Sequence, residues 1–506
     1  MTIAIELDEK KMLILESFRK ALELAKLYSE CGSHEYSGLL NGLDGGYVEP
    51  GASGALPRGK IEVLPTGRNF YAVDPMSIPT RAAWEIGVES AKRMLRKIVA
   101  ELGRYPESVG EVLWSIDAYK ADGEQLARIL YLLGVRPVWD SSGRVVGVEP
   151  IPLEELGRPR IDVVVRISGI VRDTLPNYIY LISEAVEKVI ALDEPLDMNY
   201  PKKHYEEFLA KLVEQGMSRE EASEIAMARV WGDPPGAYGA GVNYAVFASA
   251  WRSDEDLAKV WIQWGSHLYT KKRFGIANPK LFVLQLSKVD AVARNHPSDE
   301  HDPTNCCCYF AYQGGFHTAV KAVKGSDPLN LIIDTRDPMN PDVRSIKEEL
   351  ERVVYSKLLN PRWIEEMKKH GYRGASEFMK KILHLYGWQA TTRALPNEVW
   401  DRIAEKYVLD EEMRRWFMEN NPYALEEISR RLLEAAARGL WKPSEEIKEK
   451  LYRVRMEIES LLEGEVQGVA QRGEVWIYSY EDVDSWREKM KSVDEAVEWV
   501  KSFGSR

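Results

Sequence analysis

Cysteine is scarce in this chain, and its distribution excludes one class of fold. The 506 residues include four cysteines, of which three are consecutive: Cys306, Cys307 and Cys308. Adjacent cysteines cannot supply the spaced pairs of a disulfide framework. The sequence also lacks an apolar run near the ~20 residues of a membrane span. Its N-terminus is acidic where a signal peptide has a basic end and a hydrophobic run. These absences predict a cytoplasmic protein that does not cross a membrane.

An excess of positive charge and a phosphate-binding loop are missing as well. The formal net charge is −11 at pH 7, which argues against nucleic acid or an anionic membrane as the partner. No GxxxxGK[ST] sequence occurs in the chain. Any ATP that the reaction consumes must therefore be hydrolysed by another polypeptide.

The length and the hydrophobic patterning predict several parts. A chain of this size exceeds a single hydrophobic core. We predict an α/β fold, with one or more parallel-sheet α/β domains followed by a mostly helical C-terminal region. The expected parts are an N-terminal helix and Gly/Pro-rich loop (1–59), an α/β domain (60–225), a mixed α/β region that carries the site (226–340), a helical domain (341–463) and a C-terminal tail (464–506).

Apolar, β-branched runs mark the predicted strands. VGEVLWSI, RVVGVEPIP, IDVVVRIS and LNLIIDT are such runs, and the helical pattern GEQLARILYLLG separates the first from the second. Ligands of parallel sheets bind beyond the carboxyl ends of the strands. The loops after Ser115 and Ile167 are therefore expected near a site. The tail contains one strand-like run, EVWIYSY, and one helical pattern, VDEAVEWVKSF.

Residues 294–317 are unusually rich in side chains that bind metals and protons. They hold three of the eight histidines and three of the four cysteines, together with several carboxylates and a Gly314–Gly315 hinge. Burying such groups unpaired is costly, so few core segments collect them. One interpretation is a metal-handling site. The alternative is a polar loop whose cysteines pack as small hydrophobic residues.

Longer motifs point to a known family. LPTGRNFYAVDP, LEELGRPRIDVVVRISGIVRD, LDEPLDMNYPKKH, PPGAYGAGVN and LLNPRWIEEMKKHGY lie in this order along the chain. They resemble the C-terminal half of the cobaltochelatase large subunit and of the related magnesium chelatase H subunit, over about residues 40–460. The resemblance implies a tetrapyrrole-binding subunit that works with an AAA+ ATPase subunit and a subunit carrying an integrin-like domain. The ATP and its Mg²⁺ would be used by the ATPase partner.

The resemblance also implies a reaction, the insertion of Co²⁺ into a corrin-precursor ring in cobalamin biosynthesis. Co²⁺ is the substrate metal we expect, ahead of Ni²⁺ and Mg²⁺. Two alternatives remain: a non-catalytic module that binds the ring or docks the ATPase, and a paralogue that binds metal through its cysteines. Family members are much longer, so a separate polypeptide could supply the N-terminal half. The chain could equally be a fragment or a shortened paralogue.

The acidic motif of the family is altered here. Relatives resemble EHDLLDSDDYY, whereas this chain carries Asn305, Cys307 and Cys308 at positions that are acidic in them. The catalytic residues we predict are Glu300, His301 and Asp302, as ligands that deliver the metal and accept the pyrrole protons. The alternative for His301 is an ordinary loop histidine.

The cysteines suggest which metal the chain prefers. Thiolates favour Co, Ni and Zn over Mg, so His301, Cys306, Cys307 and Cys308 are the candidate metal ligands. In an extended run Cys306 and Cys308 would face one way and Cys307 the other. We therefore expect Cys306 with Cys308, or Cys307 alone, to act, and not all three. Packed thiols without a ligand are the alternative.

Family-matching cations and polar residues are candidates for holding the ring. Arginine suits bidentate pairing with peripheral carboxylates of the substrate. Each cation could instead form a structural ion pair. The predicted substrate-binding residues are Arg68, Asn69, Arg158, Arg160, Arg166, Arg172, Lys203, His204, Tyr238 and Asn243.

Overall fold

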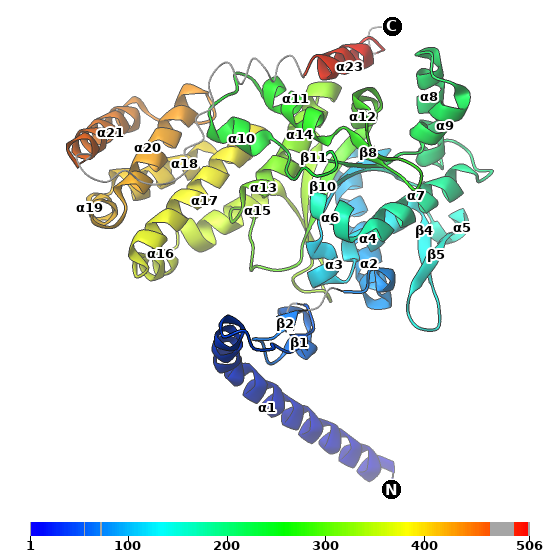
Figure 1. Cartoon of the computed structure of the whole chain (residues 1–506), viewed down its shortest axis with the longest axis horizontal. Coiled ribbons are helices and arrows are strands. Elements are labelled where there is room, and N and C mark those ends of the chain that lie inside the picture. The colour runs from blue at the N-terminus through cyan, green and yellow to red at the C-terminus, as the bar shows by residue number, and fades with distance from the viewer. Residues whose placement is uncertain (1, 55, 71–72, 466–489, 504–506) are drawn as a thin grey trace.

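An eight-stranded mixed sheet forms the centre of the molecule (Figure 1). The structure is a computed structural model that describes residues 2–54, 56–70, 73–465 and 490–503. In spatial order the strands are β12 (Asp342–Ser345), β11 (Leu329–Asp334), β10 (Val289–His296), β3 (Ser108–Leu113), β6 (Asp162–Ile167), β7 (Val230–Gly232), β8 (His267–Tyr269) and β9 (Phe274–Ala277).

The five inner strands are parallel, and the outer ones are antiparallel. β11, β10, β3, β6 and β7 run in one direction, so their carboxyl ends meet at a single edge. β12 pairs antiparallel with β11 at one side, and β8 and β9 close the other side. The predicted α/β fold is confirmed. The sheet takes strands from both sides of residue 225, so the boundary that we predicted there does not divide it.

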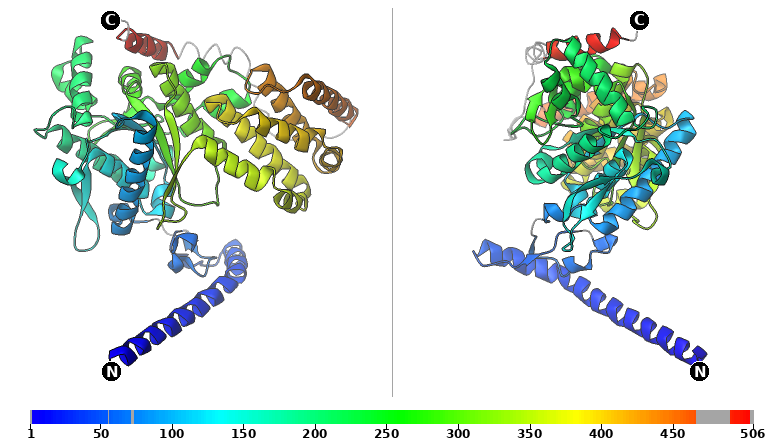
Figure 2. Two further views of the ribbon diagram at one scale, coloured as in Figure 1. Left: turned by 180° about the vertical axis from the view of Figure 1, so that it is seen from behind. Right: turned by 90° about the vertical axis from the view of Figure 1, so that its right-hand side faces the viewer.

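Both faces of the sheet are covered by helices (Figure 2). Every residue of β3, β6 and β10 is buried, as expected for parallel strands with two covered faces. The side chains of Val109 and Val163 face one helical layer, whereas those of Val112 and Val164 face the other. The first layer contains α2 (Arg81–Leu102), α4 (Glu124–Leu133) and α7 (Pro176–Ile190), and the second contains α8 (Tyr200–Glu214), α9 (Arg219–Ala226), α11 (Asp254–Gly265), α12 (Pro279–Leu286) and α14 (Gly315–Lys324).

Two predicted features have a different setting from the one expected. The run RVVGVEPIP does form a strand, β5 (Val145–Pro150), but it pairs with β4 (Val135–Trp139) in a separate two-stranded sheet. The predicted Gly314–Gly315 hinge lies inside one helical run over residues 307–324 and is buried. That run comprises α13 (Cys307–Tyr309), a π-helical turn over Phe310–Gly314, and α14.

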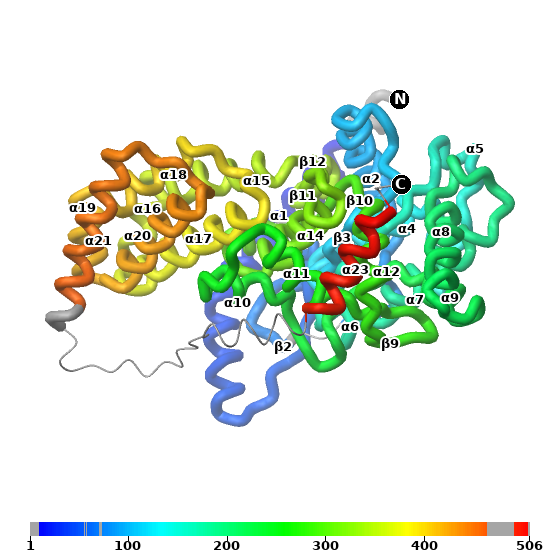
Figure 3. Tube along the Cα trace, turned by 90° about the horizontal axis from the view of Figure 1, so that it is seen from above, coloured from blue at the N-terminus to red at the C-terminus, as the bar shows by residue number. Residues whose placement is uncertain are grey.

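The helical C-terminal region lies beside the sheet and shares the core of its second face (Figure 3). The run EVWIYSY lies outside the described residues, and the last helix, α23 (Lys491–Lys501), packs on α12. The helices of the region are α15 (Ile346–Val353), α16 (Pro361–Lys368), α17 (Gly371–Thr392), α18 (Asn397–Ala404), α19 (Glu411–Asn420), α20 (Pro422–Ala437) and α21 (Glu445–Glu465), with π-helical turns at Val354–Leu358 and Glu405–Leu409.

The N-terminal helix α1 (Thr2–Leu43) extends away from the rest of the molecule (Figure 1). The segment after it carries the short strands β1 (Pro50–Gly51) and β2 (Asn69–Phe70) and reaches the carboxyl edge of the sheet through Arg58. In the described part of the chain, every helix is too short or too polar to span a bilayer.

Short helices complete the fold between these elements. Their positions matter because two of them begin directly after a parallel strand. They are α3 (Ile116–Ala121) after β3, α5 (Leu153–Leu156), α6 (Gly169–Thr174) after β6, α10 (Val242–Phe247), and 3₁₀ turns at Leu56–Arg58, Ile61–Val63 and Pro75–Ser77.

Candidate functional site

The loop that follows β10, residues 297–306, lies at the carboxyl edge of the sheet and is tied down from several sides. The Trp388 indole donates to the carbonyl of Pro303 at 3.0 Å, and the Asn305 amide donates to that of Glu300 at 3.2 Å. Nδ1 of His384 lies 2.5 Å from the carbonyl of Thr304. These bonds give a polar loop a fixed shape at the place where parallel sheets bind ligands.

Asp302 is turned into this loop and is fully buried. It accepts hydrogen bonds from the backbone N–H and the hydroxyl of Thr304, at 2.7 and 2.5 Å. Lys381 Nζ lies 3.1 Å from its carboxylate, and Lys357 forms a second ion pair. Burial alone would raise the pKa of Asp302, but the two lysines outweigh it and hold the pKa well below its usual range. Asp302 therefore anchors the loop from within.

Glu300 and His301 point outward, unlike Asp302. Their side chains are 54% and 55% exposed, and Nε2 of His301 lies 4.0 Å from the Glu300 carboxylate. The Tyr309 hydroxyl donates to the carbonyl of His301 at 3.0 Å, which fixes the backbone but leaves the ring free to turn. Lys120 pairs with Glu300 and lowers its pKa. Of the predicted catalytic trio, two members are accessible to a ligand.

A cavity of about 1040 Å³ opens next to Glu300. One wall is the N-terminal segment around β1 and β2, and the other is the start of the loop after β10. Arg58 joins the walls, since it donates to the carbonyl of Pro297 at 3.2 Å and pairs with Glu124. The polar and aromatic lining residues are Ser53, Thr66, Arg68, Tyr119, Lys120, Ser298, Asp299, Glu300 and Arg336.

The three cysteines come together, contrary to the expectation for an extended run. Cys306 is the last extended residue, and Cys307 and Cys308 open the helical run, so the chain turns between them. The three Sγ atoms all lie within 4.8 Å of one another. Nδ2 of Asn243, from α10, lies 3.6 Å from the sulfur of Cys307. All four side chains are half-buried.

An aromatic cluster that the sequence analysis did not identify surrounds Arg294, near the end of β10. The Arg294 guanidinium stacks 3.9 Å from the ring centroid of Tyr309 and 4.8 Å from that of Trp114. Trp114 also packs edge-to-face on Tyr309 and Tyr312. The position of Trp114 in the sequence could have indicated this cluster. Trp114 directly follows β3, so it lies at the same edge of the sheet as the end of β10.

Arg166, Arg172 and Tyr238 also lie at the carboxyl edge, where they hold the loop after β7. Arg166 forms a fully buried ion pair with Asp233. Arg172 pairs with Asp173 and donates to the carbonyl of Pro234 at 2.7 Å. The Tyr238 hydroxyl donates to Asp173 at 2.6 Å. These contacts occupy both guanidinium groups and leave only Tyr238 largely exposed.

Four predicted substrate-binding residues lie at the opposite, amino edge of the sheet. His204 is buried between Asp162, at 2.9 Å, and Glu107, at 3.1 Å. Lys203 pairs with the same Glu107 at 2.7 Å. Arg160 forms a bidentate pair with Glu194, with both distances 2.8 Å, and Arg158 donates to the carbonyls of Tyr131, Leu132 and Pro159. The structure does not bring this group together with the loop after β10.

Arg68 and Asn69 lie in the N-terminal segment. Arg68 donates to the carbonyls of Pro65 and Glu62, at 3.1 and 3.0 Å, while its side chain lines the cavity beside Glu300. Asn69 donates to the carbonyl of Val48 at 3.3 Å. Arg68 is thus the member of the pair that a ligand in the cavity could contact.

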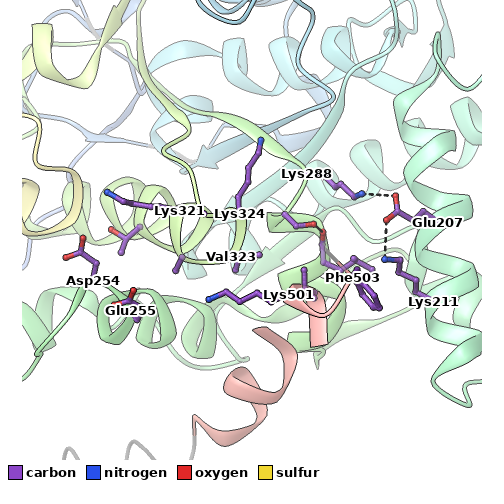
Figure 4. A pocket seen from close by; sticks show the side chains of 16 residues that line it. Glu207, Lys211, Asp254, Glu255, Lys288, Lys321, Val323, Lys324, Lys501 and Phe503 are labelled. Carbon is purple, nitrogen blue, oxygen red and sulfur yellow. Dashed lines mark hydrogen bonds and ion pairs between the residues drawn. The ribbon is translucent and has the colours of Figure 1, made fainter. Parts of the chain in front are cut away.

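A second large cavity, of about 980 Å³, lies at the amino edge between α8, α12, α14 and α23 (Figure 4). Lysines are prominent in its lining, but acids accompany them. Lys288 lies 2.8 Å and Lys211 3.5 Å from Glu207. Lys324 pairs with Asp290 at 2.6 Å. Acids thus pair with several of the lysines in this cavity. The length of the strands separates it from the loop of residues 297–306.

The comparisons with known proteins decide the family. A family model described as CobN/Magnesium Chelatase matches residues 5–448. The chain belongs to this family. The resemblance predicted from the sequence motifs is thereby confirmed, and the family covers the sheet, the cavity beside Glu300 and most of the helical region.

Several known proteins align over most of this chain. An uncharacterized protein of Methanocaldococcus jannaschii is 48% identical over 91% of this chain and 37% of its own length. The chloroplastic magnesium-chelatase subunit ChlH of Oryza sativa subsp. indica is 38% identical over 91% of this chain and 32% of its own. The solved catalytic subunit of cobaltochelatase from Mycobacterium tuberculosis matches with a TM-score of 0.81 and 39% identity, over 84% of this chain and 36% of that one. The chain spans about a third of the length of these relatives.

Proposed function

We propose that this chain is the tetrapyrrole-binding part of a multi-subunit chelatase that inserts Co²⁺ into a corrin-precursor ring. ATP hydrolysis would be carried out by an AAA+ partner, assisted by a subunit with an integrin-like domain. Family membership supports a chelatase role. The choice of cobalt is supported by the likeness to a solved cobaltochelatase subunit and by the thiol cluster of Cys306, Cys307 and Cys308, two of which stand where the relatives' motif has acids.

The observation that carries the proposal is the cavity beside Glu300. Its volume of about 1040 Å³ lies at the upper end of the roughly 300–1,000 Å³ typical of ligand pockets, which suits a large, flat macrocycle. Tyr119 and Leu56 offer apolar surface, and Arg68, Lys120 and Arg336 offer charges for peripheral carboxylates. Glu300, an exposed acid, lines it, and the exposed imidazole of His301 lies 4.0 Å from the Glu300 carboxylate.

The accessible pair Glu300 and His301 fits the chemistry of metal insertion. A divalent ion enters the ring as two pyrrole N–H bonds break, and the two protons must pass to bases. Glu300 is ionised at neutral pH because Lys120 lowers its pKa, so it can bind the incoming ion in place of water. The exposed ring of His301 offers a nitrogen that can take one pyrrole proton, and the other passes to solvent. Asp302 takes no part in these steps, because its carboxylate is bound by two lysines.

A test of the activity must also supply the part of the relatives that this chain does not cover. This chain covers about a third of each relative, so we propose that the remaining part, on the same or a separate polypeptide, completes the enzyme. The alternative of a non-catalytic ring-binding module predicts tetrapyrrole binding without metal insertion.

The experiment has two stages. First, the purified chain is titrated with corrin-precursor and porphyrin rings, and tryptophan fluorescence quenching reports binding. Second, metallation by Co²⁺ or Mg²⁺ is followed by absorption after addition of ATP, the ATPase subunits and the remaining part of the large subunit. We expect Glu300→Gln and His301→Ala each to lower the metallation rate by about 10²-fold or more while binding persists.

A surface variant provides the control. Glu445→Gln changes a 90% exposed acid on α21 and should leave both readouts unchanged. Failure of every ring to bind would refute the proposed function. Binding with undiminished metallation in both site variants would show that the chemistry lies elsewhere.

A further inference from the structure

The turn at Cys306 produces a cluster of sulfur atoms. Cys306 has extended dihedral angles, φ −137° and ψ 140°, whereas Cys307 and Cys308 are helical. A continuous strand would point neighbouring side chains to opposite faces. Here the change from strand to helix brings all three Sγ atoms within 4.8 Å of one another. Among the residues that the structure describes, this is the one such group of histidine, cysteine or acidic side chains.

The spacing of the sulfurs fits a single metal ion. Thiolates bind Zn²⁺ at about 2.3 Å, so two thiolates on a tetrahedral ion lie roughly 3.8 Å apart. Small side-chain rotations bring sulfurs that already lie within 4.8 Å to that separation. Thiolates select soft or borderline ions, and hard ions such as Mg²⁺ prefer oxygen. The donor set is therefore suited to a thiophilic divalent cation.

A neighbouring element supports one of the sulfurs. Asn243 belongs to α10, more than sixty residues earlier in the chain, yet its amide nitrogen lies 3.6 Å from Cys307 Sγ. An amide that donates to a thiolate stabilises its negative charge and fixes the orientation of a ligand. The cysteine cluster is thus held by contacts from outside its own helix.

An independent observation is the buried charge of Arg294. Its side chain is 4% exposed and its Nε has no hydrogen-bond partner. Within the described ranges no carboxylate lies at ion-pair distance from it, although a buried charge is expensive unless it is paired. Burial lowers the pKa of Arg294, whereas Tyr309, then Glu349 and last Cys306 oppose that shift. Arg294 stacks on Tyr309, the residue that follows Cys308, so its charge lies next to the cysteine segment.

We propose that Cys306, Cys307 and Cys308 together bind one thiophilic divalent cation, and that Arg294 neutralises the resulting complex. Three thiolates and one divalent ion carry a net charge of −1, which a single guanidinium balances. Binding releases the three thiol protons to solvent, and no oxidation or reduction is involved. The site goes beyond the proposed function because it requires neither a tetrapyrrole nor an ATPase partner.

Co²⁺ provides a direct spectroscopic test. The full chain is reduced, freed of reductant without air and titrated with Co²⁺ while its absorption is recorded. Thiolate ligation gives a sulfur-to-cobalt charge-transfer band in the near ultraviolet, which oxygen and nitrogen ligands do not give. We expect the band to saturate at one Co²⁺ per chain. Serine substitution of Cys306, Cys307 or Cys308 should abolish or strongly weaken it.

The chain supplies a matched control in its remaining cysteine. Cys31→Ser removes a thiol of α1 that contacts the backbone of Thr66 and should leave the band unchanged. Arg294→Gln should weaken Co²⁺ binding about tenfold to a hundredfold, with circular dichroism verifying the fold of each variant. The proposal is overturned if the wild-type chain shows no charge-transfer band, or if Cys31→Ser removes it. Detection of a disulfide among residues 306–308 in the reduced, Co²⁺-treated protein, without bound ion, would also overturn it.

Discussion

At the scale of single residues, the acids of the loop after β10 have sharply different environments. Glu300 is exposed and meets one lysine at the surface, whereas Asp302 is buried between Lys357 and Lys381. An exposed carboxylate can exchange its partner for a metal ion at little cost. A buried one that neutralises two ammonium groups cannot leave them. The two acids, although separated by one residue, therefore have separate roles: ligand contact and loop anchoring.

This division predicts the effect of Asp302→Asn. The amide keeps the size of the side chain but removes the carboxylate nearest to the buried Lys381, whose other acidic neighbour, Glu377, lies 3.9 Å away, so we expect a loss of about 3–5 kcal/mol in the free energy of unfolding. Urea denaturation measures it. The control Glu366→Gln removes an exposed pair with Lys369 and should cost less than about 1 kcal/mol. A variant as stable as the wild type but inactive in metallation would instead assign Asp302 to the chemistry.

At the scale of elements, the helical run over residues 307–324 connects the cysteines to the core. Its π-helical turn places Tyr312 so that the Trp261 indole donates to its carbonyl at 3.0 Å. Directly after the turn, α14 approaches α11 closely at Gly315. A Cβ there would lie 2.3 Å from Cδ1 of Trp261. Glycine is thus required at this position by close packing, since the backbone is ordinary right-handed helix.

Gly315→Ala tests that packing. The added methyl group must displace the buried Trp261, so we expect the free energy of unfolding to fall by about 1–3 kcal/mol in urea titrations. The charge-transfer band of the Co²⁺ complex should weaken too, because the displaced helix carries Cys307 and Cys308. Gly32→Ala, on α1 with nothing within 4 Å of the new methyl, should be neutral or slightly stabilising. Equal stability of both variants would contradict this account of Gly315.

The same elements show what the sequence could reveal. β3, β6 and β11 were predicted because uninterrupted β-branched runs need two covered faces. β10 was missed because both of its ends are polar, and only the fold supplies partners such as Arg104 and Lys324 for Asp290 at its start. The family, and Glu300, His301 and Asp302 as candidates, followed from motifs, whereas the exposure of the first two and the burial of Asp302 did not. The convergence of the three thiols did not, since it depends on a turn fixed by contacts with α10 and α17.

At the scale of the whole molecule, the cavity depends on how the N-terminal segment is attached. Arg58 is the link: it pairs with Glu124 at the start of α4 and donates to the carbonyl of Pro297. Burial raises the pKa of Glu124 to about 7, with Arg58 opposing the rise. One buried arginine therefore joins the segment, the first helical layer and the loop that carries Glu300.

Arg58→Met should detach the segment while the sheet stays folded. Without the arginine, Glu124 can take up a proton, because its pKa is already near 7 and rises further, so the loss of stability should be small below that pH. As pH rises through the folded pKa of Glu124, the unpaired carboxylate must ionise in the interior, and the stability difference from wild type should grow.

Limited proteolysis of Arg58→Met at about pH 6 should cleave residues 44–69 much faster than in wild type, and ring binding should weaken by about tenfold, corresponding to about 1.4 kcal/mol. Arg96→Met, at a 66% exposed position on α2, is the matched control. If the cleavage pattern and ring binding both match the wild type, the segment is held by other contacts and does not form a wall of the binding cavity.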